Sequence, residues 1–217
     1  MKIINFAETR SLVNQFMTEL RDENIQKDML RFRTNIQRIG EIMAYEISQT
    51  LDYKPVTTKT CLGKASGYTV ADTVVLATIL RAGLPLHQGM LNFFDHAENA
   101  FVSAYRKYIS HDDFRISIEY LAAPRIDGKT LIISDPMLAT GSSMELAYEA
   151  LLTKGKPAKV HLASVVASRQ AVEAIAKKFP DDTTLWVAAI DDEINAHKYI
   201  VPGLGDAGDL AFGEKDG

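Results

Sequence analysis

The residues best suited to carry chemistry lie between Leu131 and Leu152, in the stretch LIISDPMLATGSSMELAYEALL. Residues 131–134 predict a buried strand, Asp135 is an acid at its carboxyl end, and a helix is expected to begin near residues 142–143. N–H groups at a helix start have no partner within the helix, and the helix dipole adds partial positive charge there. The small, hydroxyl-bearing loop 139–143 is therefore suited to hold a phosphate, and the acid before it to hold sugar hydroxyls or a metal.

A second candidate is Arg81, in Leu80-Arg81-Ala82-Gly83-Leu84, which follows the β-branched run Val74–Ile79. Such a run predicts a buried strand, and an arginine at a strand end has two readings. It pairs with a nearby carboxylate, or its planar fork clamps a phosphate or diphosphate. Arg106 and Lys107 end a further predicted strand, and the sequence leaves open whether they are surface charge or ligand contacts.

The third candidate is the glycine-rich tail from Tyr199 to Asp209. One reading is a surface turn whose acids cap a helix. The other is a loop in which glycines let backbone groups approach a flat ligand closely. A backbone N–H and C=O pair could then read the amide edge of a pyrimidine such as uracil.

The elements that must position these residues alternate between strands and helices. Strands are expected at residues 74–79, 100–105, 131–134, 160–167 and 185–190, and helices at 85–94, 142–152 and 168–178. This order predicts an α/β fold with a doubly wound, mostly parallel sheet flanked by helices. Ligands of such sheets bind past the carboxyl ends of the strands, where Arg81, Arg106 and Asp135 would all lie.

The N-terminal fifty residues are expected to form a helical segment. Leu12, Phe16 and Leu20 are spaced four apart, and an apolar stripe follows over residues 29–51, which predicts core packing or a subunit contact. Beyond Pro55, residues 56–60 could form a strand, and 63–67 are turn-like.

A β-hairpin arm is expected later in the chain. Residues 114–121 alternate between apolar and polar side chains, as in a half-exposed strand. They would pair with the strand that ends at Arg106, with residues 108–113 as the tip of the hairpin.

The composition narrows the class of protein. With 217 residues, 47% of them hydrophobic, the chain is expected to form one domain spanning 1–217. Its net charge of -4 gives no support for a nucleic-acid or membrane partner. The single cysteine, Cys61, favours a reducing, cytoplasmic location, and the five histidines show no metal-ligand spacing.

Together, three segments resemble uracil phosphoribosyltransferase, a family of the type I phosphoribosyltransferase superfamily: residues 79–84, 135–143, and 199–209 with Phe212-Gly213. The resemblance implies the phosphoribosyltransferase type I fold. It implies transfer of the phosphoribosyl group from 5-phosphoribosyl 1-diphosphate (PRPP) to N1 of uracil, giving UMP and diphosphate. It also implies the cofactor Mg2+, held mainly by PRPP, with no direct protein ligand assigned.

The resemblance also assigns roles to residues. Arg81 and Arg106 would contact the diphosphate end of PRPP, and Asp206 would reach PRPP or its Mg2+. The rest of the PRPP site would be Asp135, Pro136, Met137, Leu138, Ala139, Thr140, Gly141, Ser142 and Ser143. Uracil would be framed by Ile200, Gly205, Asp206 and Ala207. Arg106 and Asp206 are the catalytic candidates, with Asp206 orienting the base or removing its proton.

Two positions depart from the family pattern. Ser142 stands where the family usually has glycine, which a serine can replace if its φ is negative. Residues 107–111 differ from the acid-containing sequence usual there, which leaves open which of them close over PRPP.

Two alternatives remain. The first is a non-catalytic regulatory protein of the same fold that senses uracil nucleotides or binds RNA, and the second is an enzyme acting on a purine or orotate. Assembly is expected to give a homodimer or a larger homo-oligomer, and activation by GTP stays open.

Overall fold

The computed structural model describes residues 1–108 and 114–215, and for residues 104–108 and 114–117 it describes the backbone alone. Its elements in chain order are β1 (Lys2–Asn5), η1 (Phe6–Glu8), α1 (Leu12–Arg21), η2 (Ile25–Lys27), α2 (Met29–Ser48), β2 (Tyr53–Lys59), β3 (Lys64–Val70), β4 (Val74–Leu80), α3 (Leu84–Leu91), β5 (Glu98–Tyr108), β6 (Phe114–Ala122), β7 (Thr130–Ser134), β8 (Met137–Leu138), α4 (Ser142–Leu152), β9 (Lys159–Ser168), α5 (Arg169–Ala176), β10 (Thr184–Asp191), β11 (Glu193–Ile194), β12 (Ile200–Val201) and α6 (Ala207–Phe212).

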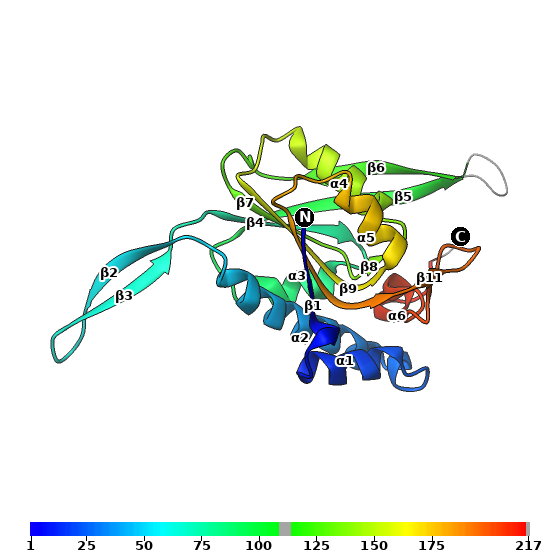
Figure 1. Cartoon of the computed structure of the whole chain (residues 1–217), viewed down its shortest axis with the longest axis horizontal. Helices are drawn as coiled ribbons and strands as arrows, with labels where there is room; N and C mark the ends of the chain where they lie inside the picture. Colours follow the sequence, from blue (N-terminus) through cyan, green and yellow to red (C-terminus); the bar gives the residue numbers. More distant parts are fainter. Residues whose placement is uncertain (109–113, 216–217) are drawn as a thin grey trace.

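The central sheet has the strand order β1-β10-β9-β7-β4-β5-β6, with the short β8 also on β9 (Figure 1). Neighbouring strands are parallel except for β5 and β6. Side chains of β4 alternate between two apolar cores: Val74 and Leu76 face one, Val75 and Ala77 the other. The first core is closed by α1, α2, α3 and α6, and the second by α4 and α5. The predicted doubly wound, mostly parallel sheet is confirmed.

The N-terminal segment differs from the expectation in two details. Residues 2–5 form the edge strand β1, paired with β10, because the β-branched Ile3 and Ile4 fit a sheet edge better than a helix. In α1 the buried positions are Val13, Met17 and Leu20, whereas Leu12 is 62% exposed. Spacings of three and four residues, rather than four alone, keep a helix face in register with the core.

The apolar stripe of α2 is used within the chain. Its buried apolar side chains all belong to the first core: Phe32, Ile36, Ile39, Met43, Ala44 and Ile47. The core reading of this stripe is confirmed. Met29, at the start of the stripe, is instead 45% exposed, and the predicted subunit contact stays a prediction.

Two hairpins leave the body of the molecule. The β2–β3 hairpin extends far to one side (Figure 1), and its turn lies at residues 60–63, where Thr60 N–H donates to Gly63 O at 2.8 Å. The turn expected at 63–67 was thus placed too late, because residues 64–67 belong to β3. The second hairpin, β5–β6, confirms the predicted arm and is paired as far as Tyr108 and Phe114. Of its predicted tip, residues 109–113 lie outside the described residues.

None of the helices in residues 1–108 and 114–215 combines the length and the apolar character that crossing a bilayer requires.

Candidate active site

The three candidate segments of the sequence meet at the carboxyl edge of the sheet. Arg81 follows β4 and Asp135 follows β7, and these two strands are parallel neighbours in the sheet. The tail reaches both of them: Asp209 forms an ion pair with Arg81, and the charge of Asp206 acts on Asp135. This edge therefore brings together an arginine, three carboxylates and a glycine-rich loop.

Arg81 is engaged by the tail. Its Nη2 donates to Asp209 Oδ1 at 3.1 Å and to the carbonyl of Gly213 at 3.0 Å. Its Nε is buried and has no hydrogen-bond partner in the part of the chain that the structure describes. The expected pairing with a carboxylate is therefore present, and the guanidinium keeps donor capacity for an anion. The importance of Asp209 was not predicted, because the partners are 128 positions apart in the sequence.

Asp135 is a buried acid, with 8% of its surface exposed. Burial raises its pKa to about 7, and the nearby charge of Asp206 adds to the effect. The Met137 N–H donates weakly to Asp135 Oδ1 at 3.5 Å, which opposes the shift. No group of three or more histidine, cysteine or acidic residues that could hold a metal exists among the described residues. The carboxylates of Asp135 and Asp206 nevertheless suit a cation or sugar hydroxyls brought by a ligand.

Residues 136–138 fasten the loop after β7 to the sheet. The carbonyl of Pro136 accepts from the N–H groups of Val165 and Val166 at 3.1 and 2.9 Å, and Met137 and Leu138 form β8 against β9. Pro136 and Leu138 are buried. These residues hold the backbone of the loop in place, and their side chains face the protein rather than an open site.

The following residues form the turn into α4. Gly141 has a φ of 80°, and a Cβ there would lie 2.8 Å from Ile175 Cγ2, so a glycine is required. Ser142 is the first residue of α4 and adopts helical backbone, so the serine fits where the family usually has glycine. The hydroxyls of Thr140 and Ser142 lie 3.0 Å apart. Hydroxyls and unpaired N–H groups thus converge at this helix start, which is the arrangement expected of a phosphate site.

A serine outside the loop fixes its position. Ser168 Oγ donates to the carbonyl of Ala139 at 2.6 Å and accepts from the N–H of Ala171 at 2.9 Å. The second bond caps α5, and the first ties the loop before α4 to the start of α5.

The tail forms a loop followed by the short helix α6. Asp206 caps this helix, because its Oδ1 accepts from the N–H groups of Gly208 and Asp209 at 2.8 and 3.1 Å. The expected capping acid is thus confirmed. Gly205 has a φ of 92°, and its backbone N–H and C=O make no hydrogen bond within the described part of the chain. Those groups can face a ligand, as the second reading of the tail requires.

Arg106 lies in β5 opposite Ile116 of β6. The side chains of Arg106 and Lys107 lie outside the described part of the structure, so the predicted contact of Arg106 with PRPP stays a prediction and the role of Lys107 stays open.

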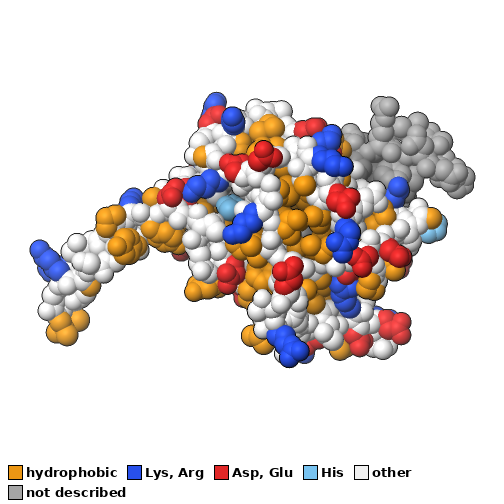
Figure 2. Space-filling model, in the orientation of Figure 1, with side chains coloured by type: hydrophobic (Ala, Val, Ile, Leu, Met, Phe, Trp, Pro, Cys, Tyr) orange, Lys and Arg blue, Asp and Glu red, His pale blue; other side chains and the backbone are white. Residues whose placement is uncertain are grey.

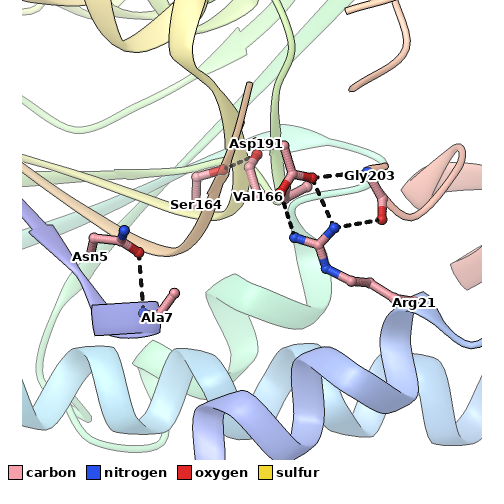
Figure 3. Close-up of polar contacts among 7 residues, drawn as sticks. All are labelled: Asn5, Ala7, Arg21, Ser164, Val166, Asp191 and Gly203. Carbon is pink, nitrogen blue, oxygen red and sulfur yellow. Dashed lines mark hydrogen bonds and ion pairs between the residues drawn. The ribbon is translucent and has the colours of Figure 1, made fainter. Parts of the chain in front are cut away.

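An ion pair that the sequence did not reveal supports the tail loop (Figure 3). Arg21, the last residue of α1, donates from both terminal nitrogens to Asp191, the last residue of β10, at 2.9 and 2.8 Å. Arg21 Nη1 also donates to the carbonyl of Gly203 at 3.2 Å, and the Gly203 N–H donates to Asp191 Oδ2 at 2.9 Å. The partners are 170 positions apart, although an acid at a strand end, as at Asp135, could have drawn attention to Asp191.

Comparisons with known proteins agree with this geometry. The family model described as uracil phosphoribosyltransferase matches residues 7–214. A uracil phosphoribosyltransferase of Porphyromonas gingivalis is 61% identical over 215 residues, covering 99% of this chain and all of that protein. One of Methanothermobacter thermautotrophicus is 40% identical over 204 residues, covering 93% of this chain and 92% of that protein.

Solved structures share the fold. A protein from Aquifex aeolicus superimposes with a TM-score of 0.87 at 26% identity, covering 99% of this chain and all of that one. A hypoxanthine phosphoribosyltransferase from Staphylococcus aureus gives a TM-score of 0.50 at 14% identity over 73% of this chain and 74% of that one, which bears on the fold alone. The family match across nearly the whole chain and the meeting of its three motifs at one sheet edge lead to one conclusion: this chain belongs to the uracil phosphoribosyltransferase family.

Proposed function

We propose that this chain transfers the 5-phosphoribosyl group from PRPP to N1 of uracil, giving UMP and diphosphate. The observation that carries the proposal is the approach of the glycine-rich tail to Asp135 and Arg81. A base site, a sugar site and a diphosphate site then lie side by side, as a transfer between two bound substrates requires. Relatives that carry the name uracil phosphoribosyltransferase support the same reaction.

In this proposal PRPP lies along the carboxyl edge of the sheet. The helix start at residues 139–143 holds its 5-phosphate, and the residues 136–138 on β9 fix that loop. Asp135 faces the ribose hydroxyls. Arg81 binds the diphosphate, and Arg106 joins it from the arm. Because Arg81 already forms an ion pair with Asp209, its guanidinium is oriented before PRPP binds.

Uracil is proposed to lie against the tail loop. Ile200 is buried, with 3% of its surface exposed, and anchors the loop in the apolar core. The backbone groups of Gly205 and the start of α6 at Ala207 would read the amide edge of the ring. Both substrates then meet near Asp206, whose charge helps to raise the pKa of Asp135.

In the reaction the bond between C1 of the ribose and the diphosphate oxygen breaks, and the bond from C1 to uracil N1 forms. The transition state carries positive charge on the sugar, so the site must hold the departing diphosphate and align the base. Arg81 and Arg106 hold the leaving group. Asp206 orients the base or accepts the N1 proton through Oδ2, because Oδ1 is occupied as the cap of α6.

Magnesium is proposed as the cofactor, and when bound with PRPP it would supply positive charge that stabilises the departing diphosphate. The carboxylates of Asp135 and Asp206 fit such a cation. Burial raises the pKa of Asp135 to about 7, and a positive charge beside this acid would stabilise its ionised form. PRPP would carry most of the ligands to the metal.

The test of the proposal is an assay with PRPP, Mg2+ and each base in turn: uracil, cytosine, orotate, hypoxanthine and guanine. UMP with uracil and no product with the other bases would support it. Product with a purine or orotate, or none with any base, would contradict it. An Asp206→Asn variant sharpens the role of Asp206, since asparagine keeps the helix cap but cannot take a proton. Unchanged turnover in that variant would remove Asp206 from the chemistry.

The regulatory alternative is not favoured. An RNA-binding member of the fold would need a continuous basic surface. On the face shown in Figure 2, acidic and basic side chains are interspersed. The intact set of Arg81, Asp135 and Asp206 also fits a catalyst better than a sensor.

Further proposals rest on the family resemblance alone. The chain is proposed to act as one phosphoribosyltransferase domain over residues 1–217, to assemble as a homodimer or larger homo-oligomer, and to work in the cytoplasm. Its oligomeric state can be measured by light scattering. Activation by GTP can be tested by adding GTP to the uracil assay at subsaturating PRPP.

A further inference from the structure

We propose that the ion pair of Arg21 and Asp191 positions the tail loop, residues 200–205, and thereby sets the affinity of the enzyme for uracil. The inference rests on the proposed function, because it assigns the base to that loop. It adds two residues that belong to none of the three motifs: one ends α1, and the other ends β10.

The contacts show why this pair acts on the loop rather than only on the scaffold. Arg21 and Asp191 bind each other through two short bonds, and each also binds the backbone of Gly203, one at its carbonyl and the other at its N–H (Figure 3). The guanidinium of Arg21 therefore holds the carbonyl of Gly203 and the carboxylate of Asp191 holds its N–H, so one two-bond ion pair fixes both polar groups of this residue. Gly203 lies two residues before Gly205, whose free backbone groups are proposed to face uracil.

The conformation of Gly203 makes the loop depend on this hold. Its φ is 58°, and a Cβ there would lie 2.1 Å from the carbonyl oxygen of Ile200, so the chain folds back tightly on itself. In the described part of the chain, the bonds to Arg21 and Asp191 are the hydrogen bonds that Gly203 makes, so its orientation depends on the pair. A rotation at Gly203 would swing the backbone of Gly205 away from the base site.

The pair is well shielded, which strengthens its contacts. Asp191 has 8% of its side chain exposed and Arg21 25%. Removing one partner would leave the other charge largely buried and unpaired, so the remaining group would seek water and release the loop.

The segment after α1 backs the loop at a second point. Gln26 of η2 donates from Nε2 to the carbonyl of Arg21 at 3.3 Å. Its Oε1 lies 3.8 Å from the place where a Cβ of Gly205 would stand. The N-terminal segment thus lies against both Gly203 and Gly205.

The experiment compares Michaelis constants for the two substrates. Arg21→Lys keeps the positive charge but loses the fork, and Asp191→Asn loses the negative charge. Each is expected to raise the KM for uracil about 10-fold, as the loss of a charge-assisted hydrogen bond would, while the KM for PRPP stays within about 2-fold. Asp191→Glu, which keeps the charge, is expected to recover part of the uracil affinity.

A matched control lies one residue further on. Arg169 also forms an ion pair with an aspartate, Asp192, but both side chains are mostly exposed and neither contacts the tail loop in the described structure. Asp192→Asn is expected to leave both Michaelis constants within about 2-fold, because exposed ion pairs contribute little.

The outcomes separate a positioning role from a merely structural one. A structural role would lower the fraction of active enzyme or raise both Michaelis constants together, and either result in Arg21→Lys would overturn the inference. If Asp191→Asn does not fold, Arg21→Lys decides alone, because it leaves no buried charge unpaired. Failure of the proposed function itself would be visible first in the unaltered protein, as an absence of UMP.

Discussion

Replacement of the buried acid Asp135 by asparagine should stabilise the protein at neutral pH. Burial raises the pKa of Asp135 from 3.8 to about 7, so the folded protein favours the protonated acid. The unfolded chain ionises near 3.8. The resulting contribution to stability is fully present below pH 3.8 and is lost as the pH rises to about 7. Since one pKa unit corresponds to about 1.4 kcal/mol, the cost above pH 7 is about 4 kcal/mol.

In an Asp135→Asn variant the side chain at this position is neutral at every pH and has nearly the same shape as the acid. The free energy of unfolding of this variant should therefore match that of the unaltered protein near pH 4 and exceed it by about 4 kcal/mol at pH 8. Urea denaturation without PRPP or Mg2+, at several pH values between 4 and 8, measures the difference. The same variant should lose activity, because an amide cannot supply the negative charge proposed to face the ribose and its cation. Stability and activity would thus change in opposite directions.

The control for this experiment is Asp206→Asn. The charge of Asp206 contributes less to the shift than burial does, so its removal should lower the pKa of Asp135 only partly. A stability difference between Asp135→Asn and the unaltered protein that does not vary with pH would refute the reasoning. So would an absence of stabilisation at pH 8, because Asp135 would then be ionised in the folded protein despite its burial.

Three further predictions concern other positions. Gly141→Ala should lower the free energy of unfolding, measured in urea, by about 1–3 kcal/mol. Gly128→Ala should lower it by less, because both glycines have positive φ but only Gly141 lacks space for a Cβ. Equal losses in the two variants would contradict the clash at Gly141. Arg81→Lys should raise the KM for PRPP about 10-fold without a matching change for uracil, since lysine lacks the fork, and steady-state kinetics decide. The pKa of His161 is lowered to about 4 by burial, so the unfolded chain takes up a proton first and stability falls between pH 6.5 and about 4. His161→Gln should flatten that fall in urea denaturation, and an unchanged pH dependence would exclude His161 as its source.

Features set by neighbouring residues could be predicted from the sequence. The strand at 131–134, the small-residue loop after it and the start of α4 near residue 142 all appear where their local pattern placed them. The apolar runs of a parallel sheet and the caps at its helix starts are properties of short stretches, so they can be read without knowing the fold.

Features that depend on distant partners could not be predicted. β1 has only four residues, and its partner β10 lies some 180 positions away. The carboxylate that holds Arg81 and the ion pair of Arg21 are separated from their partners by 128 and 170 positions. No periodicity links such residues, and only the folded chain brings them together.

The pairing of β1 with β10 has a consequence for the synthesis of the protein. The first strand of the chain joins the sheet only through β10, which ends at Asp191. As the chain leaves the ribosome from its N-terminus, residues 2–5 cannot be paired until nearly all of the sequence has emerged. Arg21 likewise cannot form its ion pair until Asp191, at the end of β10, has emerged. This edge of the sheet, and the loop beside it that is proposed to bind the base, should therefore be among the last parts of the enzyme to form, and both should be missing from shortened chains that end before β10.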